Sequence, residues 1–244
     1  MVLSEKVLNT LFRGLPFPDD IDVLYQPKDG FFPTTYTKLR NGEKARRSTK
    51  LYNCWTNMSQ RCLKGSDQQL KIKSYEGCVS EFSDYQEFAE FCYNLPHFTQ
   101  LDEFGKTYEI DKDIKGFILG KSGVYSKDTL CMIPKDINCF LTCVQKHGDV
   151  IKRSTKGVIQ KTGQYYQVRT QDVCGDRERK VMYRCEDYDE AYSKLKEIKK
   201  IQASFLANKF NGKVEDCVVE FLNSFDLDVW EKWTYEKWKN KGHQ

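Results

Sequence analysis

The sequence predicts an α+β protein in which helices and short strands alternate along 244 residues. Apolar residues recur at helical spacing in three segments, 49–63, 84–95 and 188–207. Alternating or β-branched runs typical of strands occupy four segments, 107–114, 157–159, 164–170 and 179–185. The last three of these strands precede the third helix directly, which indicates a small sheet-plus-helix module after a first, more mixed one.

Composition restricts the class of protein only weakly. Lys and Arg together number 39 against 35 Asp and Glu, so the formal net charge is only +4. This balance does not by itself indicate a nucleic-acid partner, and local clusters must carry that argument. The first residues lack the apolar core of a signal peptide, and no apolar run approaches the length of a membrane span. We therefore expect a cytoplasmic protein with no membrane segment.

Ten cysteines are spread over the chain, mostly among apolar neighbours, and no Cys-x-x-Cys motif occurs. In a reducing compartment such residues behave as small buried hydrophobes. Cys139 and Cys143 share a helix face at a spacing of four, but no second pair with zinc-binding spacing follows. Zinc is therefore not expected.

The N-terminal region, 1–47, is expected to combine a helix over 4–13 with an irregular arm. Four prolines between positions 16 and 33 exclude a long helix there. The arm ends in a basic run that includes Arg46 and Arg47, with Asn41-Gly42 as a turn signal. This run fits either a solvated loop or an arm that contacts DNA phosphates.

The central region, 48–145, is expected to begin with the helix 49–63, capped by Ser48 or Thr49. A loop that ends in a short strand follows over 64–80. Asp84 and Glu87 give the helix 84–95 a start that resembles a capping box. We expect a strand over 107–114, a hairpin over 117–133 around Gly120 and Gly123, and a helix over 134–144. A polar stretch, 146–155, then separates this region from the next.

The centre of the chain also carries the most suggestive motif. Ile110-Asp111-Lys112-Asp113-Ile114 is followed by Tyr125-Ser126, Cys131 and Asn138, and is preceded by a helix with Trp55, Met58 and Arg61. This pattern resembles the core of bacteriophage HNH (His-Me finger) homing-endonuclease-like proteins. The resemblance implies an HNH-like ββα core with flanking helices, and a protein that acts in the cytoplasm of an infected bacterium.

The same resemblance implies a chemistry for these residues. Asp111 and Asn138 would bind Mg²⁺ or Mn²⁺, Asp113 would support them, and the ion would assist phosphodiester hydrolysis. Where an active enzyme has its general-base histidine, this chain has Lys112, which stays protonated unless its pKa is depressed. His97 and His147 are the remaining interior histidines. A pair of acids beside a turn, without catalysis, is the alternative for Asp111 and Asp113.

A second pattern consists of Gly157-Val158, the strand Tyr165-Tyr166-x-Val168-Arg169 and the helix from Tyr188 to Lys199. With these features the segment 156–207 resembles the ethylene-response-factor DNA-binding domain, a three-stranded sheet with one helix. In that family the sheet enters the major groove of duplex DNA. The contacts carried over by strand position are Lys161, Tyr166, Arg169, Arg177, Arg179 and Arg184. Together with Arg46, Arg47 and Arg61, these are the DNA-binding candidates. The alternative is a small α+β domain with a solvated basic face.

The tail, 214–244, is expected to be helical and aromatic, with Trp230, Trp233 and Trp238. These residues serve either as core or as an anchor for a host protein. Three functions follow for the whole chain: a metal-assisted DNA endonuclease, a non-catalytic descendant that binds DNA or regulates a host protein, and a protein-interaction module.

Overall fold

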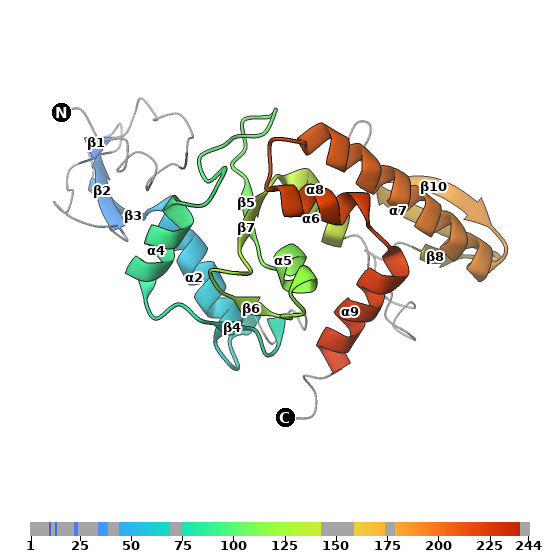
Figure 1. Ribbon diagram of the computed structural model, residues 1–244, viewed down its shortest axis with the longest axis horizontal. Helices are drawn as coiled ribbons and strands as arrows, with labels where there is room; N and C mark the ends of the chain where they lie inside the picture. The colour runs from blue at the N-terminus through green and yellow to red at the C-terminus, as the bar shows by residue number, and fades with distance from the viewer. Residues whose placement is uncertain are drawn as a thin grey trace. The chain divides into compact units, whose positions relative to one another are not determined.

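The fold is α+β, as the sequence predicts. The computed structural model describes residues 10, 13, 22–23, 34–38, 44–68, 75–142, 159–173 and 179–239. These residues include helices and small sheets (Figure 1). The chain divides into two compact units, Met1–Pro134 and Lys135–Gln244. No helix among the described residues combines the length and apolar character needed to cross a membrane.

The first unit opens with a small antiparallel sheet of order β1-β2-β3. Its strands are Asp22–Val23, Thr34–Lys38 and Lys44–Ser48. The prediction of an irregular arm over 15–47 is therefore wrong for residues 34–38 and 44–47, which lie in strands. The β-branched Thr34, Thr35 and Thr37 favour a strand, and Asn41-Gly42 stands between β2 and β3 in sequence. The helix expected over 4–13 lies largely outside the described residues.

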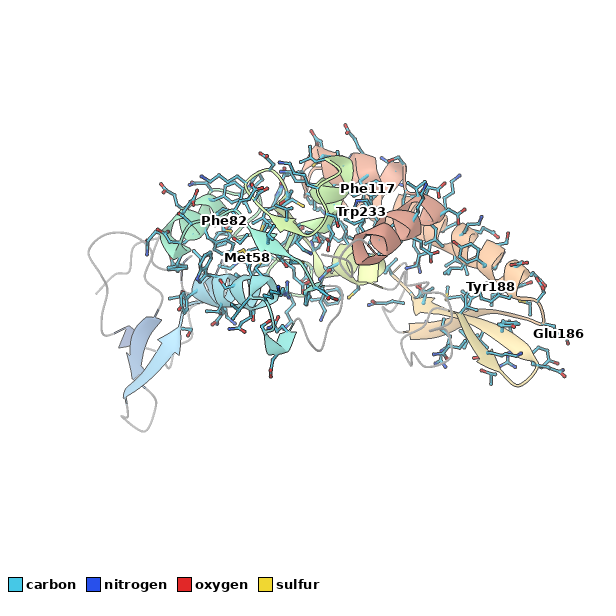
Figure 2. The ribbon with its side chains drawn as sticks, turned by 90° about the horizontal axis from the view of Figure 1, so that it is seen from below. Met58, Phe82, Phe117, Glu186, Tyr188 and Trp233 are labelled. Atoms are coloured by element: carbon cyan, nitrogen blue, oxygen red, sulfur yellow. The ribbon has the colours of Figure 1, made fainter. Side chains whose placement is uncertain are left out.

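Helices α2 (Lys50–Cys62) and α4 (Tyr85–Tyr93) confirm two sequence predictions. Thr49 caps α2, because its hydroxyl accepts the Tyr52 N–H at 3.1 Å. Asp84 caps α4 in the same way, accepting the Glu87 N–H at 2.9 Å. The two helices pack through aromatic rings, among them Trp55 and Phe88 with centroids 5.4 Å apart. Met58 and Phe82, labelled in Figure 2, belong to the same core.

Two short strand pairs complete the first unit. β4 (Val79–Ser80) runs parallel to β6 (Val124–Tyr125), and β5 (Glu109–Asp111) runs antiparallel to β7 (Cys131–Ile133). The prediction of a hairpin over 117–133 is therefore wrong, since β6 and β7 do not pair with each other but with β4 and β5. The strand expected over 107–114 ends at Asp111, because helix α5 (Asp113–Ile118) begins two residues later and buries Ile114.

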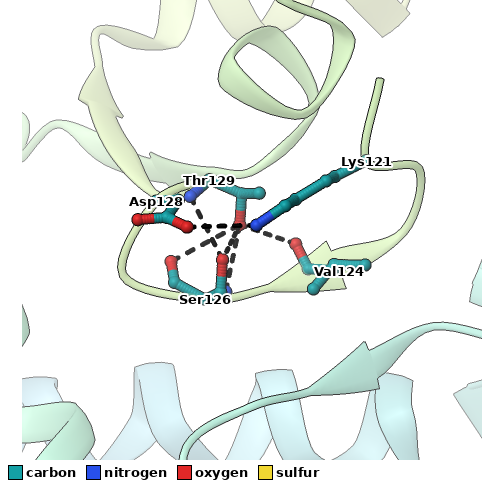
Figure 3. Close-up of polar contacts among 5 residues, drawn as sticks. All are labelled: Lys121, Val124, Ser126, Asp128 and Thr129. Atoms are coloured by element: carbon teal, nitrogen blue, oxygen red, sulfur yellow. Dashed lines mark hydrogen bonds and ion pairs between the residues drawn. The ribbon is translucent and has the colours of Figure 1, made fainter. Parts of the chain in front are cut away.

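Side-chain hydrogen bonds hold the loop between β6 and β7 (Figure 3). Thr129 donates its hydroxyl to the Val124 carbonyl at 2.8 Å and accepts the Ser126 N–H at 3.0 Å. Lys121 reaches Asp128 at 3.0 Å on the outside of the loop. The turn fixes Tyr125 on one side and leads into β7 on the other.

The second unit contains the expected three strands and helix. Helix α6 (Lys135–Thr142) comes first, followed by β8 (Ile159–Thr162), β9 (Tyr165–Gln171) and β10 (Arg179–Cys185). The strands form an antiparallel sheet with β9 in the middle. Helix α7 (Tyr188–Phe210) packs against β9 and β10, and Asp187 caps it by accepting the Glu190 N–H at 2.8 Å.

The tail folds as two helices, α8 (Asp216–Asn223) and α9 (Leu227–Lys239), and α7 contacts both. Trp230 is only 4% exposed and its ring lies 5.3 Å from that of Phe221. Of the two uses expected for the tryptophans, Trp230 serves as core. Trp233, labelled in Figure 2, packs beside it at 5.1 Å, whereas the side chain of Trp238 lies outside the described residues.

Candidate functional site

Asp111 is the last residue of β5 and stands opposite Cys131 of β7. Its side chain is 8% exposed, and Oδ2 accepts the N–H groups of Asp113 at 2.9 Å and Ile114 at 2.8 Å. The carboxylate therefore begins α5 as a cap does. Burial, reinforced by the charge of Asp113, raises the pKa of Asp111 above its ordinary value.

Lys112 lies beside this carboxylate and is buried, with 5% of its side chain exposed. Its Nζ donates to Asp113 Oδ2 at 2.9 Å. Burial works to lower the pKa of Lys112, but attraction to Asp113 and Tyr125 outweighs it and holds the pKa above the ordinary value. A general base must be unprotonated, so Lys112 in this position does not fit that role.

Two tyrosine rings lie beside the Lys112 ammonium, and an arginine contacts both of these tyrosines. Nζ lies 5.0 Å from the ring centroid of Tyr125 and 5.9 Å from that of Tyr75. Arg61 donates to the Tyr125 hydroxyl at 3.3 Å, and its guanidinium carbon lies 4.6 Å over the Tyr75 ring. We call these four residues the cation–tyrosine cluster. Because its members come from positions 61 to 125, no local sequence pattern indicates it.

The cluster changes the interpretation of Arg61. Its guanidinium is engaged by Tyr75 and Tyr125 within the first unit, which is a structural role. Contact with DNA stays a prediction for this residue. The helix that carries it, α2, is the one that the sequence predicts.

The predicted metal ligands lie in different units. Asp111 and Asp113 belong to the first, whereas Asn138 lies on α6 of the second. Among the described residues, no group of three or more His, Cys, Asp and Glu side chains is arranged to hold a metal ion. An ammonium 2.9 Å from Asp113 would repel a divalent ion placed beside it. The residues of the first unit therefore fit Mg²⁺ poorly as arranged.

His97 has a role in the backbone turn after α4. It adopts a left-handed conformation with φ of 65°, and its Nδ1 lies 2.7 Å from Gln100 Oε1. The ring also packs near Tyr108, with centroids 6.4 Å apart. These contacts give His97 a structural function; His147 lies outside the described residues.

The sheet of the second unit has two distinct faces. On β9, Val168 and Thr170 are fully buried, and Tyr166 meets Tyr188 of α7 at 5.6 Å, so these residues face the helix. Side chains alternate along a strand, which turns Tyr165, Gln167 and Arg169 to the opposite, outer face. On that face Tyr165 and Arg169 are half-buried and Gln167 is buried. Arg184 stands opposite Gln167 and also belongs to this outer face.

The outer face therefore brings two of the predicted DNA contacts, Arg169 and Arg184, to one side of the sheet. Arg184 is exposed, and its guanidinium carbon lies 5.8 Å from the Tyr165 ring. Val181, directly opposite Arg169, is also exposed. The face combines two guanidinium groups, an aromatic ring and an aliphatic side chain.

The other predicted contacts are placed differently. Lys161 stands opposite Tyr166, with Nζ 5.6 Å from its ring, so both belong to the helix side of the sheet. Arg177 lies outside the described residues. Only the backbone is described for Arg179, on β10, and for Arg46 and Arg47, on β3. Sequence alternation, with the apolar Val168 taken as core-facing, would have separated Tyr166 from Arg169.

Comparisons with protein-family models, with curated proteins and with solved structures found no match to this chain. The resemblance to HNH-like proteins and to the ethylene-response-factor domain therefore rests on the residues themselves.

Proposed function

We propose that this chain is a bacteriophage HNH-like protein that binds duplex DNA through the outer face of the β8–β10 sheet. The observation that carries the proposal is the placement of Arg169 and Arg184 on that one face, away from α7. A two- or three-stranded sheet is narrow enough to enter the major groove.

The chemistry of the outer face suits that partner. Guanidinium groups form bidentate hydrogen bonds with guanine and with phosphate oxygens. The Tyr165 ring beside Arg184 restricts the guanidinium and reduces the conformational entropy lost on binding. The aliphatic Val181 beside Arg169 suits the methyl group of thymine.

The residues of the first unit favour DNA binding without hydrolysis. The amine at the position of the general base is buried, protonated and paired with Asp113. The runner-up is a metal-assisted endonuclease. It is favoured by Asp111, which ends β5 beside β7, with α6 and Asn138 following in the chain.

The binding test uses fluorescence anisotropy with a mixed-sequence duplex at several salt concentrations. Arg169→Ala and Arg184→Ala should each weaken binding roughly tenfold and lower the salt slope by about one. Lys194→Ala removes one exposed charge from α7 and is the matched control, with little expected effect. Equal effects of all three substitutions would refute the assignment of the outer face.

The cleavage test compares the intact protein with Asp111→Ala on supercoiled plasmid in Mg²⁺ or Mn²⁺. Absence of nicking by either protein, with salt-sensitive binding retained, supports the non-hydrolytic form. Metal-dependent nicking that disappears in the variant would establish the endonuclease instead.

A further inference from the structure

Two acids flank a buried lysine at the end of β5. We propose that the Lys112 ammonium is the resident cation of the Asp111–Asp113 pair and takes the place of a divalent metal ion there. This inference goes beyond DNA binding and does not depend on it, since it concerns only residues of the first unit.

The geometry around the two acids supports this assignment. Asp113 Oδ2 lies 2.9 Å from Lys112 Nζ, a distance typical of a charge-assisted hydrogen bond. Asp111 Oδ2 accepts two backbone N–H groups at 2.8 and 2.9 Å. One carboxylate is thus balanced by an ammonium and the other by the amides at the start of α5.

The environment of Lys112 explains why the ammonium stays in place. Surface lysines keep the charged end of the side chain in water, whereas only 5% of the Lys112 side chain is exposed. The rings of Tyr75 and Tyr125 lie within 6 Å of Nζ, which compensates for part of the lost hydration. The Tyr125 ring is itself fixed by the Arg61 hydrogen bond and by the turn at Thr129.

Charge repulsion makes the ammonium and a divalent ion alternatives. Two cations beside the same carboxylate repel each other, and water screens this repulsion only in part because Lys112 is buried. An ion could bind only if Lys112 left its buried position and lost its contacts with Asp113 and both tyrosines. Removal of the amine should therefore free space beside Asp113 in which a cation can bind.

The experiment compares Lys112→Ala with Lys121→Ala by thermal unfolding in EDTA and in excess Mn²⁺. Lys121 also pairs with an aspartate, at 3.0 Å, but is exposed, so it is the matched control. Lys112→Ala should lower Tm by roughly 10 °C, because it removes a buried ammonium that pairs with Asp113 and lies against two tyrosine rings. Mn²⁺ should then raise Tm of this variant by about 5 °C and leave the control unchanged.

The double variant Lys112→Ala/Asp113→Ala separates charge compensation from packing. It should recover part of the lost Tm and show a smaller response to Mn²⁺, since the carboxylate beside which the ion would bind is gone. A response to Mn²⁺ as large as that of Lys112→Ala would contradict the proposal.

A Mn²⁺ titration of the natural protein, followed by electron paramagnetic resonance, tests the idea without relying on any variant. We expect no ion bound at these acids. One Mn²⁺ bound per chain, lost in Asp111→Ala, would overturn the assignment of Lys112. Neither result depends on DNA binding, so this proposal and the proposed function can fail separately.

Discussion

Trp230 allows the packing of the C-terminal helices to be tested quantitatively. A buried tryptophan removes roughly 150–250 Å² from water, which corresponds to about 4–6 kcal/mol at about 25 cal/mol per Å². The side chain is 4% exposed and touches the rings of Phe221 and Phe225. Because alanine retains part of this area and the unfolded chain is partly compact, we expect Trp230→Ala to cost about 4 kcal/mol.

The assay is urea unfolding followed by far-UV circular dichroism, with Val229→Ala as the matched control. Val229 precedes Trp230 on α9 and is 52% exposed, so its substitution should change stability by less than about 0.5 kcal/mol. If Trp230→Ala unfolds at the same urea concentration as Val229→Ala, the tryptophan is not a core residue. The tail would then be free to act as an anchor for another protein.

Three further substitutions test local features. Gly116→Ala should cost about 1–3 kcal/mol in thermal unfolding, because the added Cβ would lie 2.6 Å from the Lys121 carbonyl oxygen. The Lys127 ammonium, with the Ser83 donors, lowers the pKa of Glu87 from 4.5 to about 2. The ionised Glu87 therefore stabilises the folded chain above pH 4.5, and this stabilisation is lost as the pH falls towards 2. Lys127→Ala should therefore raise the Glu87 midpoint in an NMR titration; an unchanged midpoint would show that the Lys127 charge does not lower this pKa. Asp187→Ala should cost about 1 kcal/mol, measured by urea unfolding, since it removes the cap of α7, and no loss would show that the cap is dispensable.

The elements that the sequence predicts correctly are those with local signals. Thr49 and Asp84 are caps followed by apolar residues at helical spacing, and both helices begin beside them. The strands β8 to β10 alternate and are separated by turn residues such as Gly163, which has a φ of 62°. Each of these signals spans only a few residues.

The elements that the sequence does not predict depend on distant partners. Strand β6 has only two residues, and its partner β4, which begins at Val79, lies far away in the sequence. The glycines at 120 and 123 suggest a hairpin, whereas Gly120 follows a helix, α5, that Asp111 initiates. The prolines before residues 34–48 indicate an irregular arm, and the threonines that favour a strand there are a weaker local signal.

The candidate site follows the same division. Sequence motifs locate Asp111, Lys112 and Asp113, and the resemblance to the ethylene-response-factor domain points to Arg169 and Arg184. Alternation alone does not place Arg184 beside Val181, because the register of β10 shifts between Val181 and Tyr183. The contact between Lys112 and the rings of Tyr75 and Tyr125 depends on tertiary packing and could not be inferred from spacing.

The order of the strands in the first unit also bears on how the protein can be divided. An exposed turn at 102–106, with Phe104 at its tip, separates β4 from β5, β6 and β7 along the chain. The β4–β6 pair and the Arg13 hydrogen bond to the Tyr108 carbonyl, at 2.6 Å, both join segments on opposite sides of this turn. These connections remain when the chain is cut at the turn, so we expect a cut there to be tolerated better than one inside a strand.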